Sequence, residues 1–158
     1  MTPGNTVHEQ IMAAIRGNLG ENMQGYYIPP PVFGFMEAEF ISYDPQRKRL
    51  IVRFPILESY LNPYGAVQGG MLAAAIDNAL GPLSVLVGPP NMTRRLELTY
   101  SKPVRLEMKY IQVEARLLEQ EGRRMIFAAD VRDLAGVRLA RARAIHWILD
   151  EGTRVESS

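Results

Sequence analysis

The stretch that decides the fold spans residues 69–88 and reads GGMLAAAIDNALGPLSVLVG. A segment of this length that is apolar on nearly all sides predicts a helix that other elements must cover. Gly69 and Gly70 mark its start, and Gly88, which two prolines follow, marks its end. Its single ionisable side chain is Asp77. The polar residues near its centre favour a buried core helix over a membrane span.

The sequence around this helix predicts antiparallel strands. Hydrophobic residues alternate with polar ones in two segments before the helix and four after it, at residues 36–43, 50–54, 95–100, 111–117, 125–131 and 137–149. In the third of these, Leu96 and Leu98 alternate with Arg95. Short turns join several of the strands, and such strands are antiparallel. We therefore expect an α+β domain in which one curved antiparallel sheet wraps around the long helix.

Two further segments lie outside this domain. Thr6 and Glu9 have the spacing of a capping box, which predicts an additional N-terminal helix that ends between Gly17 and Gly20. The prolines at positions 29–31 require extended chain. We expect residues 1–32 to form this helix and an extended linker, residues 33–150 to form the domain, and residues 151–158 to form a C-terminal tail.

The composition excludes several classes of function. The chain has 158 residues with 18 basic and 17 acidic side chains, so neither sign of charge favours nucleic acid or a membrane surface as a partner. It has no cysteine, which excludes disulfides and thiolate metal sites and agrees with a cytoplasmic location. With two histidines only, we expect no metal site. The first residues lack the apolar run of a signal peptide.

The start of the long helix is suited to stabilising negative charge. The first amides of a helix have no partner within the helix, and the helix dipole favours an anion there. Glycine at positions 69 and 70 lets a ligand approach these amides closely. This arrangement suits the oxyanion that forms when a thioester or ester carbonyl is attacked.

Asp77 cannot share one carbonyl with the glycines of its own helix. It lies seven residues after Gly70, which turns the helix about twice and separates the two by about 10 Å along the axis. If both serve one site, the carboxylate must come from a second copy of the chain, in a dimer with antiparallel central helices and two equivalent sites. The residues by themselves leave two interpretations of Asp77 open, a catalytic acid and a structural hydrogen-bonding group.

The other polar candidates have simple structural interpretations. Asn62 is typical of a residue that caps a turn, and Thr93 of a strand residue. His146 alternates with Ile145 and Trp147, which is typical of a packed strand residue, and we expect His8 to be exposed. No phosphate loop, nucleophile elbow or zinc spacing is present in the sequence.

Taken together, the segment from residue 62 to residue 79, NPYGAVQGGMLAAAIDNA, resembles the signature of hotdog-fold acyl-CoA thioesterases of the phenylacetate-degradation (PaaI-like) type. That signature is an Asn, a Gly, a His-Gly-Gly and then a small-residue helix that carries an Asp or Glu. The later stretch LELTYSKPV, residues 96–104, looks like the strand of the family that ends in a proline. The resemblance covers residues 33–149.

The resemblance implies the hotdog fold, homodimers that often form homotetramers, and an acyl-CoA substrate that brings CoA with it, so that no separate cofactor is needed. Asp77 matches the catalytic acid, which acts as general base or nucleophile, and Gly69, followed by Gly70, matches the glycine whose amide polarises the thioester carbonyl. Asn62 matches an asparagine near the thioester or the lytic water. Thr93 falls where some members have a hydroxyl residue that helps to place that water.

The sequence departs from the family pattern at one position. The His of the His-Gly-Gly motif is Gln68 here. Glutamine can hydrogen-bond to substrate or loop, but it does not titrate near neutral pH. The expected activity is hydrolysis of an acyl-CoA thioester to a carboxylic acid and free CoA. Two alternatives remain: a non-catalytic acyl-CoA binding or sensing protein, which Gln68 favours, and a hotdog dehydratase or hydratase, which would pair a histidine with the acid.

Overall fold

The computed structural model describes residues 6–20 and 26–150, so the expected C-terminal tail lies outside the described residues. The element order confirms the predicted sequence of a helix, two strands, a long helix and four strands. The elements are α1 (Val7–Leu19), α2 (Pro31–Phe35), β1 (Glu39–Asp44), β2 (Arg49–Pro55), α3 (Gly69–Val87), β3 (Asn91–Tyr100), β4 (Tyr110–Glu121), β5 (Arg124–Arg132) and β6 (Arg138–Ile148), with 3₁₀ turns at Glu58–Tyr60 and Leu106–Met108.

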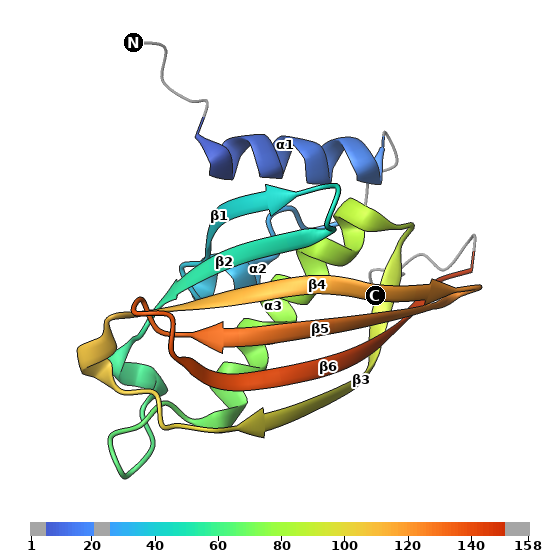
Figure 1. The fold of residues 1–158 in the computed structure, drawn as a ribbon. Helices are drawn as coiled ribbons and strands as arrows, with labels where there is room; N and C mark the ends of the chain where they lie inside the picture. The colour runs from blue at the N-terminus through green and yellow to red at the C-terminus, as the bar shows by residue number, and fades with distance from the viewer. Residues whose placement is uncertain (1–5, 21–25, 151–158) are drawn as a thin grey trace, which may run out of the picture.

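The six strands form one antiparallel sheet in the order β1-β2-β4-β5-β6-β3. The sheet curves around α3, which lies across one face of it (Figure 1). Three hairpins place sequence neighbours side by side, whereas β3 pairs with the last strand and forms an edge of the sheet. This is the hotdog fold that the sequence predicted.

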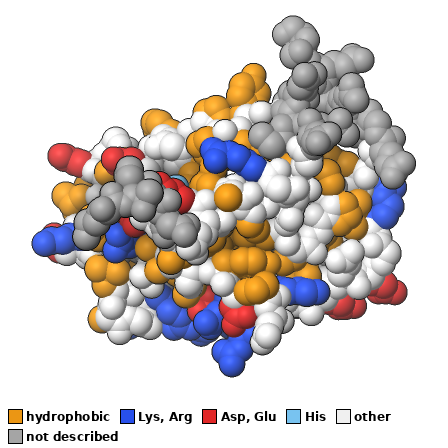
Figure 2. Space-filling view, turned by 90° about the horizontal axis from the view of Figure 1, so that it is seen from above, with side chains coloured by type: hydrophobic (Ala, Val, Ile, Leu, Met, Phe, Trp, Pro, Cys, Tyr) orange, Lys and Arg blue, Asp and Glu red, His pale blue; other side chains and the backbone are white. Residues whose placement is uncertain are grey.

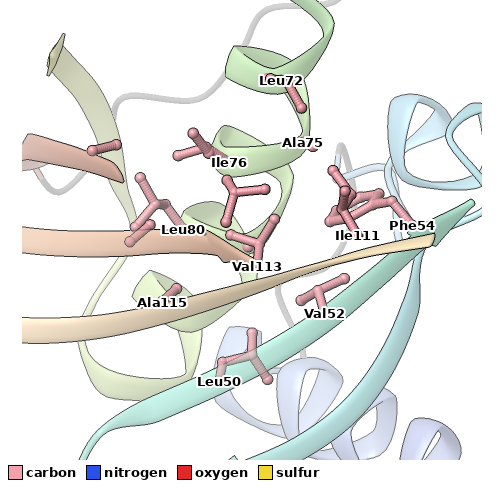
Figure 3. Close-up of a cluster of buried hydrophobic side chains, with 14 of the residues drawn as sticks. Leu50, Val52, Phe54, Leu72, Ala75, Ile76, Leu80, Ile111, Val113 and Ala115 are labelled. Carbon is pink, nitrogen blue, oxygen red and sulfur yellow. The ribbon is translucent and has the colours of Figure 1, made fainter. Parts of the chain in front are cut away.

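The core lies between α3 and the strands at the middle of the sheet. Side chains of Leu72, Ile76 and Leu80 point from the helix toward β2 and β4 (Figure 3). They meet inward residues of the two strands, and the whole group is buried: Leu50, Val52, Phe54, Ile111, Val113 and Ala115. Residues three or four positions apart share one face of a helix, and residues two positions apart share one face of a strand. The helix and each strand therefore present one continuous apolar surface to each other.

The helix α3 is long and apolar enough to pass a compositional test for a membrane span. Its packing accounts for this composition, because Ile76, Leu80 and Leu83 are fully buried against the rest of the chain. It is the core helix of the domain.

The face seen in Figure 2 carries basic and acidic side chains around a central group of hydrophobic ones, so no single sign of charge dominates that face.

The helix α1 begins as predicted. The Thr6 hydroxyl accepts a hydrogen bond from the Glu9 amide at 3.2 Å, and the Glu9 carboxylate accepts one from the Thr6 amide at 3.1 Å. The helix packs against α3 and β1. One expectation is wrong here: His8 is half-buried, because its Nδ1 accepts a hydrogen bond from the Phe40 amide and its ring lies beside that of Phe33.

The segment after the prolines also differs from the expectation. The chain is extended at Pro30, but Pro31 begins the short helix α2. Proline is well tolerated at the first position of a helix, where its missing N–H is not needed. Met36 follows the last residue of this helix and is buried in the core. The strand predicted from residue 36 therefore begins only at Glu39.

We expect Leu80→Ala to lower the free energy of unfolding by about 2–5 kcal/mol, because Leu80 is fully buried and its loss leaves a cavity between α3 and the sheet. Leu134→Ala is the control, since Leu134 is 56% exposed and should change the free energy by less than about 0.5 kcal/mol. Chemical denaturation of both variants measures the difference. Equal effects would contradict the assignment of Leu80 to the core.

Candidate active site

The first turn of α3 presents two amides without partners. Gln68 is the N-cap residue, so Gly69 and Gly70 are the first two residues of the helix. Among residues 6–20 and 26–150, neither glycine amide donates a hydrogen bond. Gly70 is exposed, and an added Cβ there would meet no atom within 4 Å. Gly70 is therefore accessible to a ligand, whereas Gly69 beside it is half-buried.

Gly69 is held in place from β3. The Tyr100 hydroxyl donates a hydrogen bond to the Gly69 carbonyl at 2.8 Å. A Cβ on Gly69 would lie 3.2 Å from the hydroxyl oxygen and the adjacent ring carbon of Tyr100. This close approach favours glycine at position 69, for a reason that does not apply to Gly70. Sequence analysis missed Tyr100, because alternation identified it only as a strand residue.

The loop before the helix is closed by Asn62. Its side-chain carbonyl accepts hydrogen bonds from the amides of Tyr64 at 3.0 Å and Ala66 at 3.1 Å. The backbone carbonyl of the same residue accepts a bond from Gly65, whose φ of +74° favours glycine. This agrees with the turn-capping interpretation. The side-chain NH₂ of Asn62 makes no hydrogen bond to any described residue.

Gln68 is exposed beside these amides. Its backbone amide donates to the Tyr60 carbonyl at 2.8 Å, which fixes the chain just before the helix. Its side chain makes no hydrogen bond within the described chain.

Tyr60 also borders a small apolar cavity beneath the first turn of α3, and its buried hydroxyl has no hydrogen-bond partner among the described residues.

Asp77 lies two turns further along α3. Its carboxylate is exposed in the single chain, although the apolar sequence around it suggested burial. The Oδ1 atom accepts a hydrogen bond from the Thr93 hydroxyl at 2.9 Å. No described residue binds Oδ2. One carboxylate oxygen is therefore anchored and the other is available to a water or a substrate.

A β-bulge brings Thr93 to Asp77. The register of β3 against β6 shifts between Thr93 and Arg95, so that Arg94 is the extra residue. Without the shift, Thr93 would share the face of Arg95. With it, Thr93 lies opposite His146 on the inner face of the sheet, toward α3. Bulges commonly re-aim a side chain in this way.

His146 lies behind Thr93. Its ring is 1% exposed and packs on Phe127, with 4.7 Å between the ring centroids. Its Nε2 is 3.2 Å from the Thr93 hydroxyl oxygen, and its Nδ1 is 2.8 Å from Asn91 Oδ1. The prediction of a packed strand residue was right for its burial, but sequence pattern could not detect its link to Asp77.

Burial lowers the pKa of His146 below its ordinary value of 6.5, and the negative charge of Asp77 acts in the opposite direction. A lowered pKa means that the unfolded chain binds this proton more readily than the folded chain. His146 therefore opposes folding only as the pH falls below about 6.5.

The candidate residues form two separate groups in one chain. Asn62, Gln68 and the two glycines surround the start of α3, whereas Asp77 and Thr93 lie about 10 Å along the helix axis. Among the residues that the structure describes, no three His, Asp or Glu side chains come close enough to hold a metal ion. The geometry supplies amide donors at one place and an anchored carboxylate at the other.

Solved structures of other proteins share this fold. No family model matches the chain. A phenylacetic acid degradation-related protein of Ralstonia eutropha, described as a putative thioesterase, matches with a TM-score of 0.73 and 23% identity over 83% of this chain and 99% of that one. The PaaI protein of E. coli, from the phenylacetic acid degradation operon, matches with a TM-score of 0.72 and 14% identity over 86% and 96%.

A hypothetical thioesterase of Streptococcus pneumoniae, solved with coenzyme A, matches with a TM-score of 0.65 and 18% identity over 71% of this chain and 85% of that one. Two further structures are variants of that protein, one with an aspartate replaced by alanine and one with a threonine sixteen residues later replaced by alanine. These likenesses confirm the hotdog fold and the resemblance to phenylacetate-degradation proteins inferred from residues 62–79.

We expect Gly69→Ala to lower the free energy of unfolding by about 1 kcal/mol, because the new Cβ displaces the Tyr100 hydroxyl from the Gly69 carbonyl. Gly70→Ala is the matched control. It meets no atom and replaces a poor helix former, so it should leave stability unchanged or raise it by up to about 1 kcal/mol. Thermal and denaturant unfolding of the pair would rule out this role of Tyr100 if the two variants behaved alike.

Proposed function

We propose that the protein is an acyl-CoA thioesterase, which hydrolyses a thioester to a carboxylic acid and free CoA. The observation that carries the proposal is the Asp77 carboxylate on a hotdog helix, anchored through Oδ1 by Thr93 and open at Oδ2. The amides of Gly69 and Gly70, which have no partner in the part of the chain that the structure describes, supply the second requirement, a place for an oxyanion.

The spacing of the acid and the hydroxyl supports the same proposal. Sixteen positions separate Asp77 from Thr93, and sixteen separate the aspartate and threonine replaced in the Streptococcus pneumoniae protein. That protein was solved with coenzyme A, and a Streptococcus mutans protein of the same fold was solved with acetyl-CoA. We infer that this chain also takes an acyl-CoA, and that its site requires no metal or resident cofactor.

We further propose that each site combines Asp77 of one protomer with the Gly69 amide of its partner. Gly69 and Asp77 are eight residues apart, about 12 Å along a single α3, which is too far for one carbonyl to touch both. The face of α3 that carries Gly70, Asp77 and Gly81 is not covered by the chain itself, since no atom would contact a Cβ at either glycine. Two such faces packed antiparallel would bring the groups together in a homodimer.

In the proposed reaction, Asp77 Oδ2 takes a proton from water as the water oxygen attacks the thioester carbonyl. The Gly69 amide stabilises the oxyanion that forms. The tetrahedral intermediate then collapses, the C–S bond breaks, and the leaving thiolate takes the proton from Oδ2. Asn62 and Gln68 border the amides, and their side-chain NH₂ groups, which bond to no described residue, can donate to the substrate.

Two other functions use the same residues. A non-catalytic acyl-CoA binding protein would need the amides and Gln68, but it would have no use for an anchored, open carboxylate. A dehydratase would pair a histidine with the acid at the substrate. His146 is linked to Asp77, but it is 1% exposed and lies behind Thr93, so its ring does not reach the substrate.

We expect Asp77→Asn to abolish thiol release from acyl-CoA substrates, because the variant keeps the shape of the side chain but has no base. A thiol-release screen over aromatic and aliphatic acyl-CoAs measures the effect. Glu119→Gln removes an exposed carboxylate on β4 and should leave turnover unchanged. Full turnover by Asp77→Asn would refute the mechanism, and acyl-CoA binding without thiol release by the unmodified protein would favour the binding function.

We expect Gly69→Pro to lower kcat about 10²–10³-fold, because proline removes the amide proposed to stabilise the oxyanion. Proline is compatible with the first helical position, and Gln68 has the extended ψ of 133° that a residue before proline prefers. Gly69→Ala is the control, since it introduces the same Cβ near Tyr100 but keeps the N–H. Equal losses in the two variants would show that the amide is not used.

The same variants test the shared site. A heterodimer of Asp77→Asn with Gly69→Pro would contain one site with both defects and one with neither, so the purified heterodimer should have about half of the activity of the unmodified dimer. If each site belonged to a single protomer, every site in the mixture would keep one defect and no activity would return. Co-expression with two different tags and purification of the doubly tagged dimer makes the measurement.

A further inference from the structure

Four side chains form a continuous chain of hydrogen bonds from the proposed active site into the core. Asp77 Oδ1 is 2.9 Å from the Thr93 hydroxyl, Thr93 is 3.2 Å from His146 Nε2, and His146 Nδ1 is 2.8 Å from Asn91 Oδ1. This row of hydrogen-bonded side chains joins α3, β3 and β6. The proposed function uses Asp77 at one end of it and leaves His146 without a role.

The inner end of this chain has a fixed orientation. The side-chain nitrogen of Asn91 donates to the Pro89 carbonyl at 2.9 Å and to the Ser84 carbonyl at 3.4 Å. Reversing the amide would direct its oxygen at both carbonyls, so Oδ1 must face the imidazole. Because Oδ1 can only accept, His146 Nδ1 must carry a hydrogen.

The three contacts need one hydrogen more than a neutral His146, Thr93 and an ionised Asp77 supply. Each of the three contacts needs one hydrogen. A neutral His146 supplies the hydrogen on Nδ1, and Thr93 supplies one from its hydroxyl. With a neutral ring and an ionised Asp77, Thr93 can donate to the carboxylate or to Nε2 but not to both. For all three contacts to be hydrogen bonds at once, an additional proton is needed, on His146 Nε2 or on Asp77 Oδ1.

We propose that Asp77 and His146 share this proton through the Thr93 hydroxyl, and that His146 is a positioning residue that acts on Asp77 through Thr93. With the proton on Nε2, the ring donates to Thr93, Thr93 donates to Oδ1, and Asp77 is a fully oriented carboxylate. Loss of the proton leaves Thr93 divided between two acceptors and releases this orientation. The inference rests on the proposed function for its effect on catalysis, but not for the existence of the shared proton.

The shared proton is not consumed in the reaction. Oδ2 receives the proton of the attacking water and later gives it to the leaving thiolate, while Oδ1 stays bonded to Thr93. His146 therefore touches neither water nor thioester. Its contribution is to hold the carboxylate in one direction during both transfers, and loss of such alignment costs on the order of a hundredfold in rate.

The surroundings of the imidazole support this interpretation. Among the described residues, the imidazole meets the neutral Thr93 and Asn91 of β3, Met125 and Phe127 of β5, and, through Thr93, Asp77 of α3. Asp77 is the charged group that acts on the ring, and it opposes the effect of burial on the pKa of His146. The carboxylate therefore offsets part of the lowering of the His146 pKa, of which burial is the larger cause.

Nitrogen-15 NMR of the histidine rings tests the shared proton without substrate. The chain has two histidines, so a His8→Gln variant assigns both sets of signals. We expect Nδ1 of His146 to remain protonated throughout a pH titration while Nε2 loses its proton. We expect Asp77→Asn to lower the titration midpoint of His146 and to leave that of His8 unchanged. An unchanged His146 midpoint, or a neutral ring protonated on Nε2, would overturn the proposal.

The pH dependence of kcat/KM tests the positioning role. We expect kcat/KM of the unmodified protein to fall with rising pH at the His146 midpoint seen by NMR. His146→Gln should lack this fall, because a glutamine NH₂ can donate to Thr93 at every pH. Thr93→Val should lower kcat about 10- to 100-fold with little change in KM, and Thr93→Ser, which keeps the hydroxyl, should restore it.

The outcomes separate the two proposals. Thr93→Val combined with His146→Gln should be no slower than Thr93→Val alone, because both remove one linked unit. Additive losses, or a His146→Gln variant with an unchanged pH profile, would assign His146 a packing role only and overturn the proposal. A shared proton seen by NMR in a protein that hydrolyses no acyl-CoA would refute the proposed function while leaving the shared proton intact.

Discussion

The structure depends on one constraint, which is that the apolar helix α3 must be removed from water. A single antiparallel sheet meets this requirement by curving around the helix, and β2 and β4 supply the inward side chains that cover Ile76 and Leu80. The helix α1 adds a second contact, with the Asn18 side chain donating to the carbonyls of Val85 and Leu86. One face of α3 remains uncovered, and it is the face that carries Asp77.

The same helix provides both chemical groups of the proposed site, for different physical reasons. Its first turn has amides without partners because every helix begins this way, and Gly69 and Gly70 leave those amides accessible. Its middle carries a carboxylate because position 77 lies on the uncovered face, where a charge remains solvated. A rigid core helix fixes the distance between the two groups, and this distance is what makes a second protomer necessary in the proposed mechanism.

The sequence predicted much of the fold and part of the candidate site. Periodicity located α3 and five strands well, since these elements are long and regular. It failed near Pro31, where three prolines suggested extended chain, because proline also suits the first turn of a helix. The roles of Asp77, Gly69 and Asn62 came from residue type and order within residues 62–79, and they stay predictions until they are tested. Tyr100 carried no signal in the sequence that would separate it from any other strand tyrosine.

What the sequence determined by itself was the pattern of apolar residues, and with it the core helix, the strand order along the chain and the isolated acid at position 77. What only the tertiary structure decided was the environment of that acid. Regular alternation would place Thr93 on the outer face with Arg95, and a bulge at Arg94 turns it inward to Asp77 and His146. A bulge depends on how two strands distant in sequence pair with each other. No local pattern of residues can therefore reveal the hydrogen-bonded chain from Asp77 to Asn91.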